Sequence, residues 1–177
     1  MHTVIVYESM YGNTREIAEA IAEGVREADP QAAVDCLPVA EADADLTRTA
    51  DLLVVGGPTH MRSMSTGLSR RMAASAEGHK AGHEAAAAEA RETVEGPGLR
   101  SWFHDLPDTE PGTHAAAFDT RVAMPRAGGA ADGIAHRLSR HHYDVVVEPE
   151  GFLVKDADGP LRAGERERAR AWGTGLV

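Results

Sequence analysis

Residues 4–14 read VIVYESMYGNT and join a hydrophobic run to the start of an amphipathic helix. The β-branched side chains of Val4, Ile5 and Val6 are typical of a strand. The segment that follows, TREIAEAIAEGVREA at 14–28, has the apolar spacing of a helix. A helix that begins directly after a strand directs its first backbone N–H groups and the positive end of its dipole into the connecting loop. The stretch therefore predicts an anion-binding loop.

The side chains of this loop indicate which anion it suits. Gly12 allows a tight turn, and hydrogen-bond donors stand at Ser9, Tyr11, Asn13 and Thr14. Neither GxxxxGK[ST] nor GxGxxG is present, the loop has no lysine, and the nearest cation is Arg15. Hydroxyl and amide donors favour one phosphate monoester over a triphosphate with magnesium. The alternative is an ordinary strand–helix turn with a Thr or Asn cap.

Length and charge limit the possible functions. The 177 residues fit a single domain, 1–177. With 18 basic and 28 acidic residues the net charge is −10, which argues against nucleic-acid binding and is compatible with a basic protein partner. Cys36 is the only cysteine, so no intrachain disulfide forms and we expect a reducing, cytoplasmic location. No apolar run approaches the about 18 residues of a membrane span, so no membrane insertion is expected.

Strand and helix patterns alternate along the chain, which is the signature of an α/β fold with a parallel sheet. Strands are predicted at 3–8, 33–37, 51–57, 114–119 and 145–147, the last resuming at 152–154. Helices are predicted at 14–28, from about 66, at 99–106, at 131–142 and at 163–176. Large apolar residues are almost absent from 73–98, and we expect an exposed helical or mobile excursion over 76–96.

Three loops with distinctive chemistry follow the first, third and fourth predicted strands. They span residues 9–14, 58–65 and 120–129. Because ligands of such sheets bind beyond the carboxyl ends of the strands, these loops are expected to share one site.

These segments resemble the flavodoxin family over most of the chain, 76–96 excluded. Residues 9–14 (SMYGNT) match the family's phosphate loop at every diagnostic position, and the stretches 56–60 (GGPTH) and 117–121 (AFDTR) are similar to the starts of its two flavin loops. The resemblance implies a flavodoxin-like, three-layer, doubly wound sandwich with a five-stranded parallel sheet of order 2-1-3-4-5. It also implies FMN as the cofactor. The implied cofactor-binding residues are Ser9, Met10, Tyr11, Gly12, Asn13, Thr14, Pro58, Thr59, His60, Met61, Asp119, Thr120 and Arg121.

The loops for the flavin ring depart from the family pattern. Flavodoxins commonly hold the isoalloxazine between aromatic side chains from both loops. Here the first loop offers His60 and Met61, and the second has no aromatic residue between 120 and 129. Arg121 and Arg126 would favour the reduced flavin anion if they lie near the ring, by the Coulomb argument that shifts pKa values. In the alternative both arginines point to solvent.

The resemblance implies an FMN-binding electron-transfer protein that exchanges electrons with redox partner proteins, a reductase and an acceptor. In that role no residue acts as an acid or base, because the flavin does the chemistry. The alternative is an FMN-dependent NAD(P)H/quinone-type reductase, for which the bare second loop leaves an open flavin face. A receiver-like signalling module is disfavoured because the third strand ends in Gly56-Gly57 and not in an aspartate. A degenerate domain that no longer binds flavin is a further alternative.

Overall fold

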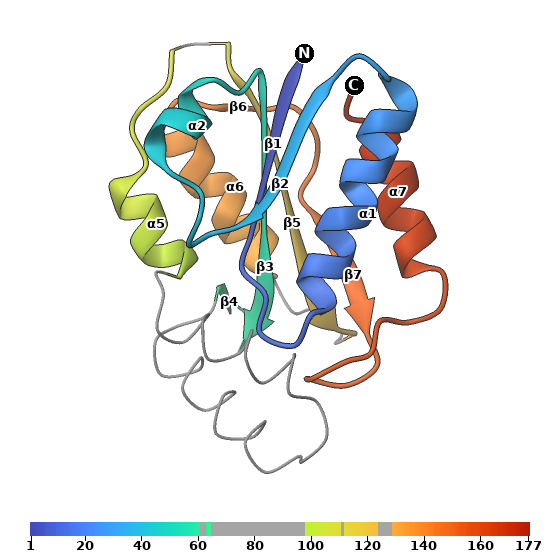
Figure 1. The fold of residues 1–177 in the computed structure, drawn as a ribbon. Helices are drawn as coiled ribbons and strands as arrows, with labels where there is room; N and C mark the ends of the chain where they lie inside the picture. Colours follow the sequence, from blue (N-terminus) through green and yellow to red (C-terminus); the bar gives the residue numbers. More distant parts are fainter. Residues whose placement is uncertain (61–62, 65–97, 111, 124–128) are drawn as a thin grey trace.

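A parallel sheet with helices on both faces forms the protein (Figure 1). The computed structural model describes residues 1–60, 63–64, 98–110, 112–123 and 129–177. Its elements are β1 (His2–Tyr7), α1 (Asn13–Ala28), β2 (Ala33–Pro38), α2 (Ala44–Arg48), β3 (Leu52–His60), β4 (Ser63–Met64), α5 (Leu99–Asp105), β5 (His114–Val122), α6 (Ala130–Arg140), β6 (Asp144–Val145), β7 (Glu150–Val154) and α7 (Glu165–Thr174).

The strand order confirms the predicted topology. The sheet has the order β2-β1-β3-β5-β6, and each neighbouring pair is parallel. The predicted fifth strand is split into β6 and β7, which pair in parallel with successive parts of β5. One difference concerns residues 58–65, which were predicted to be loop: β3 continues to His60, and the short β4 pairs antiparallel with its end.

Side chains of β1 alternate between two hydrophobic cores because successive residues of a strand point to opposite faces. Val4 and Val6 pack in the core under α5 and α6. Ile5 and Tyr7 pack in the core under α1 and α7. Figure 1 shows these two layers on either side of the sheet. Because β1, β3, β5 and β7 are parallel, their carboxyl ends lie at one edge of the sheet.

Helix α1 buries the stripe predicted from its sequence, since Ile17, Ile21 and Val25 are fully buried. Two acidic residues on another face of α1 contact α7. Glu23 pairs with Arg166, and the Glu27 carboxylate accepts a hydrogen bond from Arg170 at 2.9 Å. Half-exposed pairs of this kind contribute little stability, but they fix the register between α1 and α7.

The described part of the structure contains one helix that was not predicted from the sequence. Helix α2 was not predicted, because five residues are too few for a helical period; its N-cap is Asp43, whose side chain accepts from the Leu46 N–H at 2.8 Å. The helix expected from about 66 and the excursion at 76–96 lie outside the described residues. Burial raises the pKa of the Cys36 thiol to about 12, which favours the protonated thiol over the reactive thiolate.

Candidate functional site

The connection between β1 and α1 leads the chain directly into a helix N-terminus (Figure 1). Gly12 is the N-cap residue of α1 and has a φ of 80°, a left-handed conformation that glycine adopts without strain. As a glycine it supplies no side-chain oxygen to the first N–H groups of α1, which lie at the positive end of the helix dipole. A Cβ atom at this position would meet nothing within 4 Å, so the space beside the helix end is open in the described part of the chain. This geometry suits the phosphate of FMN.

Residues 9–11 of the same loop differ in exposure. Ser9 and Met10 are almost completely buried, at 4% and 3% exposure, whereas Tyr11 is partly exposed. The loop is therefore anchored in the protein at its strand end and open at its helix end.

Thr14 connects the loop to the end of β5. Its hydroxyl lies 2.8 Å from the hydroxyl of Thr120, and both side chains are buried. A hydrogen bond between two buried hydroxyls holds the first loop against the third one. The structure thus brings together two of the three loops that were predicted to share a site.

Asn13 has a partner that was not predicted. Its amide nitrogen donates to the carbonyl of Asp158 at 3.2 Å, in the turn between β7 and α7. A Cβ atom at Gly159 would lie 2.5 Å from the Asn13 amide, so the turn packs directly on this side chain. The Asn13 side chain thus joins the start of α1 to the turn between β7 and α7.

The end of β3 is clamped to the start of α6 by Thr59 and Asp119. The Thr59 hydroxyl accepts from the Ala130 N–H at 2.7 Å and donates to the Asp119 carboxylate at 3.0 Å. The same carboxylate oxygen accepts from the Ala131 N–H at 2.9 Å. Thr59 and Asp119, both predicted as cofactor residues, therefore fix the end of β3 against the start of α6. These two segments flank the expected ring site.

Asp119 is completely buried, and burial raises the pKa of its carboxyl group above the ordinary value. The Ala131 N–H, the Arg121 guanidinium and the Thr59 hydroxyl each lower this pKa, although their effects are smaller than that of burial. Nε of Arg121 lies 3.3 Å from the other carboxylate oxygen of Asp119. Cβ atoms at Gly129 or Gly151 would collide with the guanidinium, so these glycines provide its space. The structure thus pairs Arg121 with a buried carboxylate. The two alternatives considered from the sequence, a position near the flavin ring and a position in solvent, did not include this ion pair.

Replacing Thr59 with valine is expected to destabilise the protein by about 1–3 kcal/mol, because the buried Ala130 N–H loses its acceptor. Urea unfolding monitored by circular dichroism measures this change. Thr59→Ser keeps the hydroxyl and should retain most of the stability. Equal unfolding free energies for Thr59→Val and Thr59→Ser would contradict the clamp.

Glu8 was missed as a site residue. It lies directly after β1 with 1% exposure, and its carboxylate accepts from the Leu99 N–H at the start of α5 at 2.8 Å. An acid placed directly after the apolar run of β1 was the sequence signal for this role. Glu8 joins the phosphate loop to α5.

Three of the residues discussed for the flavin ring lie wholly or partly outside the described part of the chain. The His60 side chain and all of Met61 and Arg126 lie outside the described residues, whereas Pro58 is partly buried in β3 and pairs with Thr120. Over the described ranges, no group of three or more His, Cys, Asp or Glu is arranged to hold a metal ion. Among the same residues no helix has the length and apolar character needed to cross a bilayer.

Comparison with known proteins confirms the family resemblance. The flavodoxin family model matches residues 5–79, a segment that contains the phosphate loop and β3. A relative from Geobacter sulfurreducens, an NAD(P)H dehydrogenase (quinone), is 34% identical over a segment that covers 36% of this chain. That segment spans 43% of the relative's own length.

Solved structures share the fold of the described residues. A flavodoxin from the domain Archaea has a TM-score of 0.65 at 20% identity, with 99% of this chain and 96% of that chain covered. Flavodoxin 1 from Bacillus cereus has a TM-score of 0.66 at 17% identity, with 100% and 97% covered. At these identities the similarity shows a flavodoxin-like fold.

Proposed function

We propose that the protein binds FMN and acts as an electron carrier of the flavodoxin type. The observation that carries this proposal is the start of α1 at Gly12, an open helix N-terminus that the Thr14–Thr120 hydrogen bond holds beside β5 and that suits an anion. The family model matches this segment, and flavodoxins share the fold.

The proposed FMN site has two parts, one for the phosphate and one for the ring. The backbone of residues 12–14 would hold the phosphate, together with Ser9, Met10 and Tyr11 of the same loop. Pro58, Thr59, Thr120 and Arg121, with His60 and Met61, would border the ring, and Asp119 would position Thr59 and Arg121. Bound FMN supplies the redox chemistry by accepting and donating one or two electrons. The protein's own residues determine affinity, potential and access.

An FMN titration of the purified protein tests the proposal. We expect a protein with bound FMN to show the visible absorption of a flavin, and free FMN to lose fluorescence as it binds at micromolar concentration. Absence of both signals would overturn the proposal and would favour a domain that no longer binds flavin.

A second candidate is an FMN-dependent NAD(P)H/quinone-type reductase. It is favoured by the partial match to the NAD(P)H dehydrogenase (quinone), and by the lack of an aromatic residue between 120 and 129. Steady-state oxidation of NAD(P)H with a quinone by the FMN-loaded protein would support this enzyme. Reduction of the bound FMN only after a flavoprotein reductase is added would support the carrier.

The proposal includes redox partner proteins, one that donates and one that accepts electrons. A net charge of −10 would attract basic partners by electrostatic steering. It also includes a cytoplasmic location, which rests on Cys36 being the single cysteine of the sequence.

A further inference from the structure

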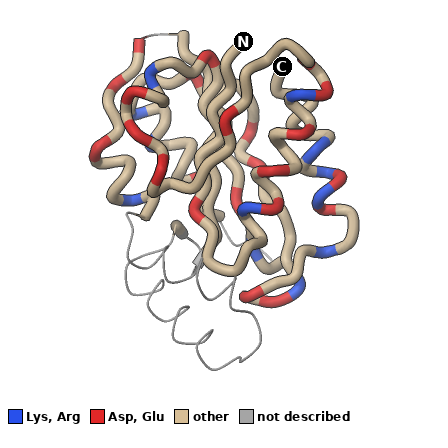
Figure 2. Tube along the Cα trace, viewed as in Figure 1, with Lys and Arg blue, Asp and Glu red and all other residues tan. Residues whose placement is uncertain are grey.

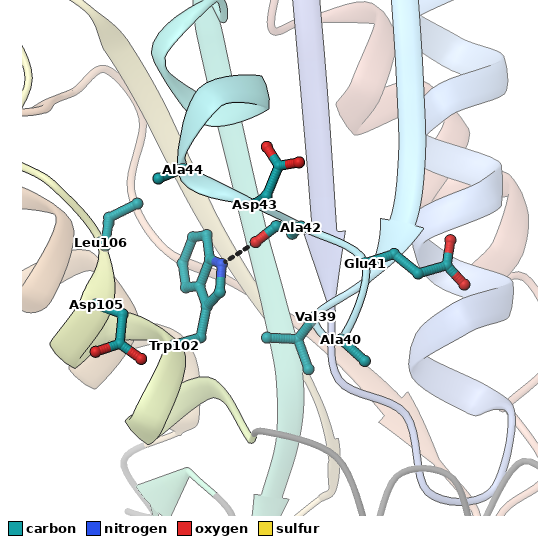
Figure 3. Close-up of a pocket in the computed structure, with 9 residues that line it drawn as sticks. All are labelled: Val39, Ala40, Glu41, Ala42, Asp43, Ala44, Trp102, Asp105 and Leu106. Atoms are coloured by element: carbon teal, nitrogen blue, oxygen red, sulfur yellow. Dashed lines mark hydrogen bonds between the residues drawn. The ribbon is translucent and has the colours of Figure 1, made fainter.

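A pocket of about 240 Å³ lies between the β2–α2 connection and α5 (Figure 3). Its floor includes the Trp102 indole, which is 7% exposed and donates from Nε1 to the Ala42 carbonyl at 2.8 Å. Val39 and Leu106 add apolar surface. The hydrogen bond fixes the indole plane, so the floor of the pocket is rigid.

Three acidic residues lie at the edge of this pocket. Glu41, Asp43 and Asp105 line the pocket, all three are exposed, and no Lys or Arg is among the lining residues. In Figure 3, Asp43 and Asp105 lie on opposite sides of the indole with their carboxylates turned outward, and the Glu41 side chain extends away from the indole. Figure 2 shows acidic and basic positions on this α2 and α5 side, and the arginine residues of these two helices, Arg48 and Arg100, are not among the residues that line the pocket. The pocket therefore favours a cation with an apolar stem.

Two backbone contacts place the pocket beside the proposed flavin site. The Val39 N–H donates to the Tyr7 carbonyl at 2.8 Å, immediately before the phosphate loop. The Leu99 N–H donates to Glu8, and α5 runs from this contact to Asp105. With a rise of about 1.5 Å per residue, Trp102 lies about 5 Å along the helix from Leu99. A protein held at the pocket would stand next to the carboxyl edge of the sheet.

We propose that this pocket receives an arginine side chain of a basic redox partner protein; the partner's role rests on the proposed electron-carrier function. The volume is below the about 300 Å³ at which pockets for drug-sized ligands begin, and it suits one long side chain. A guanidinium stacks on an indole face and pairs with carboxylates, while its aliphatic stem covers apolar surface.

Binding of an arginine side chain can be measured without FMN. The probe is N-acetyl-arginine methylamide, and its neutral isostere N-acetyl-citrulline methylamide is the control. We expect the arginine compound to shift the Trp102 indole N–H signal in NMR spectra saturably, with about tenfold higher affinity than the citrulline compound. The Trp172 indole is an internal reference, since it packs against Phe118 and Phe152 in the other core. Equal binding of the two compounds, or no shift, would overturn the proposal.

Variants test which carboxylates act. Asp43→Asn keeps a side chain that caps α2 and removes only the charge. Combined with Glu41→Gln and Asp105→Asn, it should abolish the preference for arginine over citrulline. Asp45→Asn is the matched control, because Asp45 is outside the pocket and pairs with Arg48. Loss of the preference in Asp45→Asn as well would overturn the assignment.

Cytochrome c, a basic electron acceptor, tests the role in docking. Its reduction by the FMN-loaded, reduced protein at low ionic strength should slow several-fold in the triple variant and not in Asp45→Asn. Unchanged reduction would overturn the docking role even where the arginine compound binds. Failure of FMN binding would overturn the electron-carrier function, and the NMR experiment would still decide whether the pocket binds arginine.

Discussion

Replacing Gly12 with aspartate is expected to weaken FMN binding about 100-fold relative to replacement with asparagine. Gly12 precedes the first turn of α1, and a Cβ atom there would meet nothing within 4 Å. Its φ of 80° lies in the left-handed region, which Asp and Asn tolerate better than other side chains. Both variants should therefore fold, and their side chains should occupy the same open space.

The difference between these two variants is one negative charge beside the proposed phosphate position. A carboxylate about 6 Å from a phosphate with about two negative charges costs about 2–3 kcal/mol at an effective dielectric constant of about 40. That free energy corresponds to about a 100-fold change in the dissociation constant.

Fluorescence titrations with FMN and with riboflavin measure the effect. Riboflavin has no phosphate, so the two variants should bind it with similar affinity. Equal FMN affinities for Gly12→Asp and Gly12→Asn would show that the phosphate does not lie at the start of α1. A parallel loss of riboflavin binding in Gly12→Asp alone would indicate a disturbed ring site instead.

Local sequence patterns predicted the sheet and the strand–turn–helix connection of residues 4–14 because both depend on short-range rules. The run Val4–Val6 followed by Gly12 specifies a strand, a tight turn and a helix start within a few residues. The split of the last strand was also visible, since Pro149 interrupts the apolar pattern between β6 and β7.

Contacts between distant segments could not be predicted in this way. The Asn13–Asp158 hydrogen bond spans 145 positions and the Glu8–Leu99 bond spans 91. A single sequence shows that Asn13 and Glu8 are polar, but it does not show which backbone groups the fold places opposite them. For the same reason Thr59 and Asp119 were predicted as cofactor residues, while their role as a clamp emerged only from the structure.

The ion pairs between α1 and α7 could not be predicted from the sequence either. Glu23 and Glu27 have the spacing of an exposed helix face, and Arg166 and Arg170 have it too. Each face alone predicts solvation. The structure packs α7 against α1, so these charges meet at the border of a helix–helix contact.

That contact has little room for added atoms, and Gly24→Ala is expected to destabilise the protein by about 3 kcal/mol. A Cβ atom at Gly24 in α1 would lie 2.0 Å from the Arg170 carbonyl oxygen in α7. Gly173 gives the reciprocal contact, because its Cβ atom would lie 2.3 Å from the Ile21 carbonyl oxygen. The obstacles are backbone atoms, so the helices must separate, and overpacking of this kind costs about 1–3 kcal/mol or more.

Separation of the two helices would also disturb the aromatic cluster beneath them. Trp172 of α7 packs edge-to-face on Phe118 and Phe152, with ring centroids 6.4 and 6.2 Å apart. Movement of α7 therefore loosens a buried contact in addition to relieving the collision. This second loss places the expected destabilisation at the upper end of the range for overpacking.

Gly133→Ala in α6 is the matched control, because a Cβ atom there would meet nothing within 4 Å. In an open helical position alanine is favoured over glycine by about 1 kcal/mol, so this variant should be more stable than the unmodified protein. The same substitution thus has opposite signs at Gly24 and Gly133. Urea unfolding without FMN measures both variants, with the Trp172 fluorescence reporting on the α1–α7 contact. If Gly24→Ala were as stable as Gly133→Ala, α1 and α7 would not touch through their backbones at this crossing.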